Sequence, residues 1–240
     1  MSKYPKVLVG IVTYEGKDYI WDKFINNIKS LTYPNFDVMI VDNTKDKKYY
    51  NKLNRRLKDT DIIIKHVNRG DTSREAQARS LNTIRDYFLE NNYDYFMSIE
   101  SDLIPPRDII QRLMRHNKLV VGTIYLIGFH YSKTQPPRPC LFSVRKKKNG
   151  SGEMETYNIP NGFDYFGNGL VKIHGCGIGC VLIDKSILQK VKFWYHLDPP
   201  VKHSDVLFYM DLHNMGIPVY IDSDLIIPHH NSDWKDVADK

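Results

Sequence analysis

Residues 94–106 read Asp94-Tyr-Phe-Met-Ser-Ile99-Glu100-Ser101-Asp102-Leu-Ile-Pro-Pro106, an apolar run that leads directly into two carboxylates. The apolar run predicts a buried β-strand over residues 94–99. Alternate side chains of an extended segment point the same way, so we expect Glu100 and Asp102 to face one cleft while Ser101 faces elsewhere. The stretch therefore predicts a strand whose carboxyl end presents a pair of acids.

Two carboxylates that share a cleft repel each other unless a cation joins them. A hard divalent ion, Mg²⁺ or Mn²⁺, can join them and use its remaining positions for diphosphate oxygens and water. The alternative is structural, because Pro105-Pro106 predicts the start of a helix through Met114, and Asp102 would then only cap that helix.

Outward from this stretch, short β-branched runs alternate with amphipathic segments, which is typical of a mostly parallel sheet with helices on both faces. The fold class is therefore α/β and Rossmann-like. We expect further strands over residues 7–12, 37–41, 62–67, 119–123, 179–183 and 219–222, and helices over 19–31, 73–88, 105–114 and 204–215. Residues 126–175 lack clear periodicity and predict a loop-rich insertion with one hairpin, 140–145 against 153–157.

The composition fits one domain with a sizeable core, since the 240 residues are 42% apolar and 26% charged. The three cysteines are too few for a disulfide framework, and Cys176 and Cys180 lack a second pair at zinc-site spacing. No signal peptide and no apolar run of membrane-spanning length is evident, so we expect a soluble, cytoplasmic protein. The net charge of +6 permits an anionic partner, although a lysine-rich composition explains it equally well.

Three of the predicted strands end in polar or acidic residues, namely Thr13-Tyr14-Glu15, Asp42-Asn43-Thr44 and Glu100-Ser101-Asp102. Each group taken singly is compatible with ordinary turn chemistry at a strand end. Because ligands of open α/β sheets bind at the carboxyl ends of the strands, the three groups are expected to converge on one rim.

With these motifs in order, the sequence resembles the GT-A fold glycosyltransferases, particularly the family 2-like group. The resemblance covers most of the chain and depends on the order and spacing of motifs that are individually unspecific. They are Ile11–Glu15, Val41–Asn43, Ala76–Asn82, Ile99–Pro106, Gly175–Ile183, and Ser204–Phe208 with the segment from Gly216 to His229.

The resemblance implies a single GT-A domain over residues 1–240 that transfers a sugar from a nucleotide-diphosphate sugar to an acceptor hydroxyl. Residues 1–123 would form the nucleotide-sugar-binding half and residues 124–240 the acceptor-side half. A UDP-sugar is the favoured donor, and the acceptor would be a glycan, a lipid-linked sugar or, as an alternative, DNA.

The resemblance also implies roles for the strand-end residues in donor binding. Thr13, Tyr14 and Glu15 would cradle the nucleoside, and Asp42 would accept a hydrogen bond from uracil or a similar base. The remaining donor-binding candidates follow from the same motifs: Asn43 beside Asp42, Arg79 near the diphosphate with Arg74 as a second candidate, Glu100 and Ser101 beside the metal, and Gly175 and Gly177 beneath the transferred sugar.

For the metal and the base, Asp102 stands in the Asp-x-Asp motif of the family, with Glu100 in place of the first acid. His229 would complete the metal shell, with His230 as the alternate. Asp205 matches the general base, which predicts inversion at the anomeric carbon. Ser204 departs from the acidic neighbour that the family places there, and an N-cap at the start of a helix is the alternative role for Asp205.

Three other readings of the sequence stay open to different degrees. A nucleotidyltransferase would ordinarily carry a glycine- and lysine-rich phosphate loop after the first strand, where this chain offers only Gly16 and Lys17. A catalytically inactive nucleotide- or sugar-binding module is compatible with Ser204 and Glu100. DNA as the acceptor is suggested by basic residues at 145–148 and by interleaved aromatic and basic residues at 129–133, without a recognised nucleic-acid motif.

Overall fold

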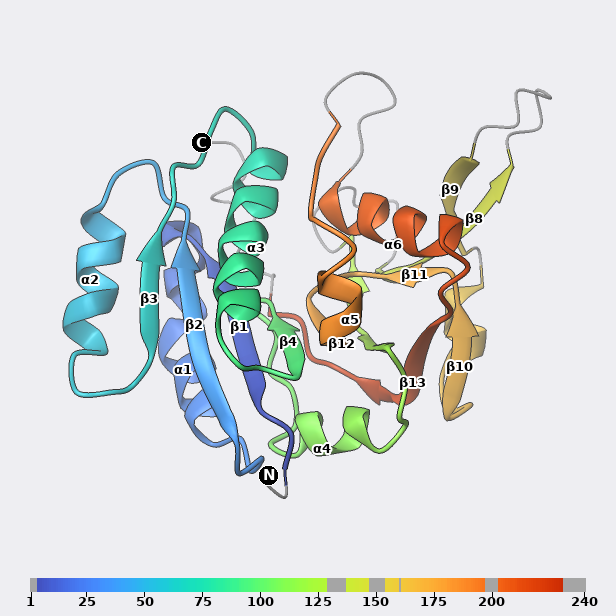
Figure 1. Ribbon diagram of the computed structural model, residues 1–240, viewed down its shortest axis with the longest axis horizontal. Coiled ribbons are helices and arrows are strands. Elements are labelled where there is room, and N and C mark those ends of the chain that lie inside the picture. The colour runs from blue at the N-terminus through green and yellow to red at the C-terminus, as the bar shows by residue number, and fades with distance from the viewer. Residues whose placement is uncertain (1–3, 129–136, 147–153, 160, 197–202, 231–240) are drawn as a thin grey trace.

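The computed structural model describes residues 4–128, 137–146, 154–159, 161–196 and 203–230. Its centre is an eight-stranded sheet in the order β10-β13-β5-β12-β4-β1-β2-β3, with helices on both faces (Figure 1). The strands of this sheet are β1 (Val7–Thr13), β2 (Phe36–Asp42), β3 (Ile63–His66), β4 (Tyr95–Ile99), β5 (Val120–Ile124), β10 (Leu170–Ile173), β12 (Cys180–Asp184) and β13 (Val219–Ile226).

Strands β3, β2, β1 and β4 run parallel, and their side chains alternate between two apolar layers. In β1, Val7, Val9 and Ile11 face one layer and Leu8 faces the other. Because both faces of the sheet are buried, these strands are continuous apolar runs rather than alternating ones. The prediction of a mostly parallel α/β sheet is confirmed.

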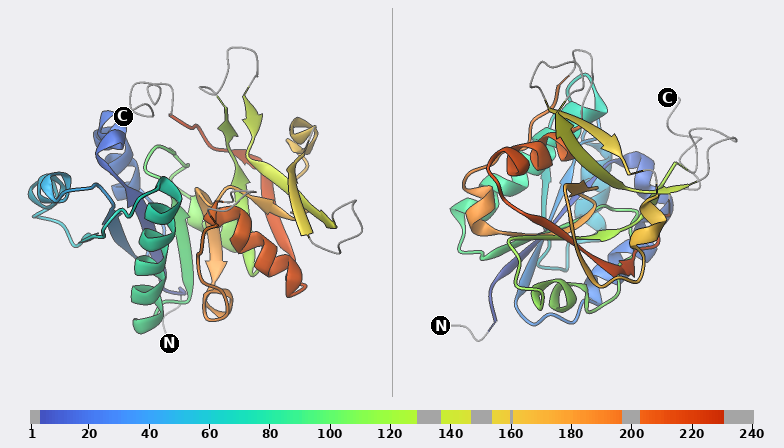
Figure 2. Two further views of the ribbon diagram at one scale, coloured as in Figure 1. Left: turned by 90° about the horizontal axis from the view of Figure 1, so that it is seen from above. Right: turned by 90° about the vertical axis from the view of Figure 1, so that its right-hand side faces the viewer.

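Helices cover the two faces of the sheet separately, as Figure 2 shows from above. Apolar residues of α1 (Trp21–Lys29), α2 (Lys48–Arg56) and α4 (Ile109–Met114) belong to one layer. Those of α3 (Ser73–Glu90), α5 (Lys185–Leu188) and α6 (Ser204–Asn214) belong to the other. Gly10 lets α3 lie close to β1, since a Cβ at that position would lie 2.2 Å from the Phe96 ring and 2.6 Å from Ile84.

The carboxyl-terminal part of the sheet is mixed. Strand β12 lies antiparallel between β4 and β5, β13 is parallel to β5, and β10 is antiparallel to β13 at the edge. The predicted insertion forms a three-stranded sheet, β11-β8-β9, and a two-stranded sheet, β6-β7. Their bounds are β6 (Leu126–Ile127), β7 (Arg138–Pro139), β8 (Leu141–Lys146), β9 (Met154–Asn158) and β11 (Gly175–Cys176). The predicted hairpin is therefore confirmed as β8 and β9.

Several predicted elements need correction. The helix expected from Tyr19 begins at Trp21, because a 3₁₀ helix, η1 (Glu15–Ile20), precedes it. Helix α2 was not predicted, since Lys48–Arg56 carries only Tyr49 and Leu53 on its buried side. The helix expected to open at Pro105 begins at Ile109, so Asp102 does not cap it.

Beyond these shifts, α3 begins at Ser73, as predicted, but Thr72 is its N-cap and accepts from the Glu75 amide at 3.1 Å. A second 3₁₀ helix, η2 (Gly162–Tyr165), lies in the insertion. Across the described part of the chain, no helix combines the length and apolar character that a membrane span requires.

Candidate active site

One cavity of about 490 Å³ lies at the carboxyl ends of β1, β2 and β4, where ligands of open α/β sheets bind. Its lining comes from the strand ends, from α3, from the insertion and from the start of α6. The lining that matters here is Thr13, Tyr14, Lys17, Asn43, Arg69, Glu100, Ser101, Asp102, Tyr125, Cys140, His203, Asp205 and His229.

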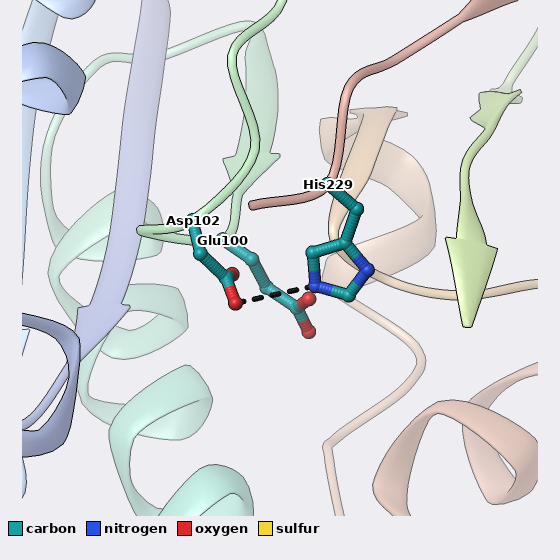
Figure 3. A group of neighbouring side chains, drawn as sticks. All are labelled: Glu100, Asp102 and His229. Carbon is teal, nitrogen blue, oxygen red and sulfur yellow. Dashed lines mark hydrogen bonds and ion pairs between the residues drawn. The ribbon is translucent and has the colours of Figure 1, made fainter. Parts of the chain in front are cut away.

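Glu100, Asp102 and His229 form a compact cluster in this cavity, with one ligand atom from each lying within 4.8 Å of the others (Figure 3). The two acids follow β4, while His229 comes from the segment after β13. An isolated antiparallel bridge between Leu103 and His229 joins the segments, and the His230 amide donates to the Asp102 carbonyl at 2.9 Å. The backbone therefore fixes the imidazole opposite the acids.

The imidazole of His229 is held in one orientation. Its Nδ1 lies 2.8 Å from the Leu126 carbonyl and its Nε2 lies 3.2 Å from Asp102 Oδ2. Since a carbonyl only accepts, Nδ1 carries a proton, and in the neutral ring the lone pair of Nε2 faces the acids. Burial alone would lower the pKa of His229, but the hydrogen bond that the protonated ring donates to Asp102, together with the charge of Asp102, outweighs burial and raises the pKa.

The two buried acids differ in their partners, because Asp102 Oδ2 contacts both Lys17 and His229, whereas the pKa of Glu100 is raised. Burial and the neighbouring charge of Asp102 raise the pKa of Glu100 to about 7. The Asp102 side chain is fully buried, and its Oδ1 has no hydrogen-bond partner among the described residues. Two carboxylates and one imidazole suit Mn²⁺, and also Mg²⁺ through the oxygens, so the residues fit a divalent ion.

Asp205 lies in the same cavity, in the first turn of α6. Burial raises its pKa, and the neighbouring His203 and the Val206 amide offset that effect only in part. The Val206 amide donates to Asp205 Oδ1 at 2.7 Å. Helix α6 takes His203 as its N-cap without a side-chain hydrogen bond, so the N-cap alternative for Asp205 does not hold.

Asp42 lies outside the cavity lining, although Asn43 beside it belongs to the lining. The Asp42 carboxylate is fully buried, and its Oδ1 accepts from the Thr44 hydroxyl at 2.7 Å. Its Oδ2 lies 2.9 Å from Nδ1 of His66. Recognition of a base by Asp42 stays a prediction, and it would require Asp42 to exchange one of these partners.

Other predicted donor-binding residues also lie outside the lining. Arg79 pairs with Glu75, and the Glu15 amide donates to the Thr44 hydroxyl at 3.0 Å. The remaining ones outside the lining are Arg74, Gly175 and Gly177, together with the alternate metal ligand His230. His230 faces away from the cluster, with its Nε2 3.3 Å from Lys23 Nζ.

Gly175 and Gly177 allow close packing behind the cavity wall. A Cβ on Gly175 would lie 2.2 Å from the Phe142 ring, and one on Gly177 would lie 1.8 Å from the Tyr125 hydroxyl. Tyr125 in turn packs edge-on against His229, with ring centroids 5.3 Å apart. Gly177 thus makes room for the Tyr125 ring beside His229, and contact of either glycine with a sugar stays a prediction.

Two lining residues were not predicted to belong to the site: Lys17, considered only as a weak sign of a phosphate loop, and Arg69. The guanidinium of Arg69 lies 5.1 Å from the centre of the Tyr14 ring and donates to Asn43 Oδ1 at 3.3 Å. The glycine after Arg69 is a sequence signal for a turn, and in the structure Gly70 has a φ of +70°. Nothing in the sequence shows that this turn folds back over the end of β1.

The two basic segments that could contact DNA lie largely outside the described residues. Residues 129–133 lie outside the described residues, as do Lys147 and Lys148. Within the described part of the hairpin, Arg145 Nε pairs with Glu155 Oε1 at 2.7 Å. DNA as the acceptor stays a prediction.

The comparisons with known proteins identify the fold. No family model and no curated protein sequence matches the chain. Among solved structures, it is similar to the mannosyltransferase PcManGT from Pyrobaculum calidifontis in complex with GDP-Man and Mn²⁺, with a TM-score of 0.60, 12% identity, and coverage of 95% of this chain and 58% of that one. It is also similar to S. aureus TarS 1-349, with a TM-score of 0.54, 13% identity, and coverage of 92% and 59%.

These similarities confirm the GT-A-like glycosyltransferase fold that the sequence predicted. The chain spans about three fifths of the length of both solved proteins. At such low identity the likeness concerns the fold, and activity has to be argued from the site.

Proposed function

We propose that this chain is a metal-dependent glycosyltransferase that moves a sugar from a nucleotide-diphosphate sugar to an acceptor hydroxyl. The observation that supports the proposal is the meeting of Glu100, Asp102, His229 and Asp205 in one cavity at the carboxyl ends of the sheet. The fold is also similar to that of the two solved proteins described above, and this similarity favours the same reaction class.

The donor would lie across the strand ends. Asp102, Glu100 and His229 would hold the divalent ion, which supplies Lewis-acid neutralisation of charge on the departing diphosphate. Tyr14 and Asn43 line the cavity on the β1 and β2 side and would contact the nucleoside. The buried Oδ1 of Asp102, which has no hydrogen-bond partner among the described residues, would be available to the ion as a ligand atom.

Asp205 would act as the general base. Its carboxylate would take the proton of the acceptor hydroxyl while that oxygen attacks the anomeric carbon on the face opposite the departing diphosphate, which inverts the configuration. Burial raises the pKa of Asp205, which strengthens the carboxylate as a base. Since a base is most effective when its pKa lies near the working pH, the shift favours this role.

The expected donor is a UDP-sugar, and a GDP-sugar is the second candidate because PcManGT is complexed with GDP-Man. The acceptor would be a glycan or a lipid-linked sugar, with DNA as the alternative. Binding without catalysis is the competing function, and it has no separate structural support.

The test is a hydrolysis and transfer screen of the purified chain with UDP- and GDP-sugars, with Mn²⁺, with Mg²⁺ and with a chelator. The proposal predicts release of the nucleoside diphosphate that depends on the divalent ion and is lost in Asp102→Asn. Tight nucleotide binding without turnover of any donor would instead identify a binding module. Turnover that is unchanged by chelator and by Asp102→Asn would exclude the proposed metal site.

A further inference from the structure

Lys17 places a positive charge directly on the proposed metal ligand. It belongs to η1, the turn after β1, and its amide donates to the Tyr14 carbonyl at 2.9 Å. The turn carries the side chain across the cavity, where Nζ forms an ion pair with Asp102 Oδ2. Only 12% of the Lys17 side chain is exposed and the Asp102 carboxylate is fully buried, so solvent screens this pair much less than a surface pair.

The ion pair occupies the oxygen that also faces the imidazole. Asp102 Oδ2 lies 3.2 Å from His229 Nε2 and contacts Lys17 Nζ, whereas Oδ1 is buried without a partner among the described residues. A divalent ion held by the cluster would stand beside this ammonium, and the two like charges would repel. The ammonium and the ion therefore compete for one carboxylate.

A lysine can leave such a pair without disturbing the fold. Its flexible four-carbon stem lets the ammonium move, and an ammonium binds phosphate oxygens as a point charge. Lys17 and Tyr14 line the same cavity as Glu100, Asp102 and His229. A diphosphate that joins a nucleoside near Tyr14 to an ion at these three residues would therefore pass close to Lys17. The donor diphosphate would thus offer the displaced ammonium a new anion.

From this geometry we propose that Lys17 is a positioning residue that exchanges partners during donor binding. It neutralises Asp102 before the donor arrives, and it moves to a phosphate oxygen of the nucleoside diphosphate when the divalent ion takes the carboxylate. This inference rests on the proposed function, and it adds that the ion and the diphosphate enter the site together.

The exchange predicts effects of opposite sign when Lys17 is replaced. Without the competing ammonium, Mn²⁺ alone should bind more tightly to Lys17→Met than to the wild type. The nucleoside diphosphate, which loses a phosphate contact, should bind more weakly in the presence of Mn²⁺. Each change should be about tenfold, which corresponds to about 1.4 kcal/mol. A purely structural lysine would weaken both.

The experiment is calorimetric titration of the wild type, Lys17→Met and Lys17→Arg with MnCl₂ alone, and then with UDP and GDP at saturating Mn²⁺. Lys17→Arg keeps the charge and should lie closer to the wild type in both titrations. Lys23→Gln is the matched control, because it removes a lysine charge that contacts His230 rather than the acids. It should leave both affinities unchanged.

The outcomes separate the two proposals. Opposite shifts in Lys17→Met support the exchange. If Lys17→Met binds Mn²⁺ and nucleotide as the wild type does, or binds both more weakly, the exchange is wrong. The metal site is still supported in that case, provided that Mn²⁺ binding by the wild type is lost in Asp102→Asn. If the wild type binds no Mn²⁺ even with nucleotide, the proposed function itself fails and the exchange fails with it. Circular dichroism establishes that each variant is folded before it is titrated.

Discussion

The two halves of the molecule build their share of the site in different ways. Residues 4–123 form regular parallel strands, and Glu100 and Asp102 follow directly where β4 ends. Residues 124–230 hold antiparallel strands and short sheets, and they supply Asp205 from the start of a helix and His229 from an extended segment. Topology positions the site residues of the first half, whereas individual contacts position those of the second half.

The clearest way to test the first half is Asp102→Asn. The substitution keeps the shape of the side chain but removes the charge that would hold the ion. Lewis-acid assistance is worth several kcal/mol, so transfer should fall by roughly 1000-fold or more. Steady-state kinetics across Mn²⁺ concentrations would check this, and full activity at high Mn²⁺ would contradict it.

The second half is tested most directly by Asp205→Asn. Removing a general base costs about 100- to 10,000-fold in the transfer rate, while donor binding should stay nearly unchanged. Equal losses in donor affinity and in rate would show that Asp205 acts in binding instead.

The raised pKa of Asp205 predicts the direction of two changes, one in the pH dependence of transfer and one in the stability of the folded protein. The base must be ionised, so transfer should fall on acidification at a pH above the ordinary aspartate value of 3.8. Because the folded state prefers the protonated form, ionised Asp205 is destabilising at neutral pH, and Asp205→Asn should raise the melting temperature. Calorimetry at pH 7 and a pH–rate profile would measure these effects, and an unshifted profile would refute the first.

His229→Gln addresses the contact that joins the two halves. It removes the imidazole but leaves both acids, so the affinity for Mn²⁺ should fall by at least the 10- to 100-fold typical of losing an outer-shell partner. Titration with MnCl₂ measures this directly, and His230→Gln is the matched control because His230 faces Lys23. Equal losses in the two variants would contradict a specific role for His229 in metal binding.

The smallest effects are expected for two glycine substitutions that test packing, one in each half of the molecule. Gly10→Ala would overpack Phe96 and Ile84, at a cost of about 1–3 kcal/mol, with a fall in melting temperature of roughly 2–4 °C for each kcal/mol. Gly177→Ala would displace Tyr125 from His229, so it should also weaken Mn²⁺ binding. If Gly10→Ala reduced Mn²⁺ affinity to the same extent, the two halves would not differ in the way described.

What the sequence could predict follows the same division. Strands buried on both faces are continuous apolar runs, so β1, β2 and β4 and the acids after β4 were evident from local pattern. The contact between Asp42 and His66 was not evident, because it depends on the register between β2 and β3. Lys17 and Arg69 were not predicted to line the cavity for a related reason, since a 3₁₀ helix and a loop bring them there.

The order of the strands bears on how this chain acquires its structure. Strand β12 fills the place between β4 and β5, yet about sixty residues separate it from β5 along the chain. Until that strand emerges from the ribosome, both flanking strands keep an unpaired edge, and such edges invite association between chains. Pairings so distant in sequence also slow folding. His229 is synthesised later still, so a nascent chain would hold the two acids long before it could complete the cluster. Contact with chaperones or with metal during this interval would therefore affect the yield of folded protein.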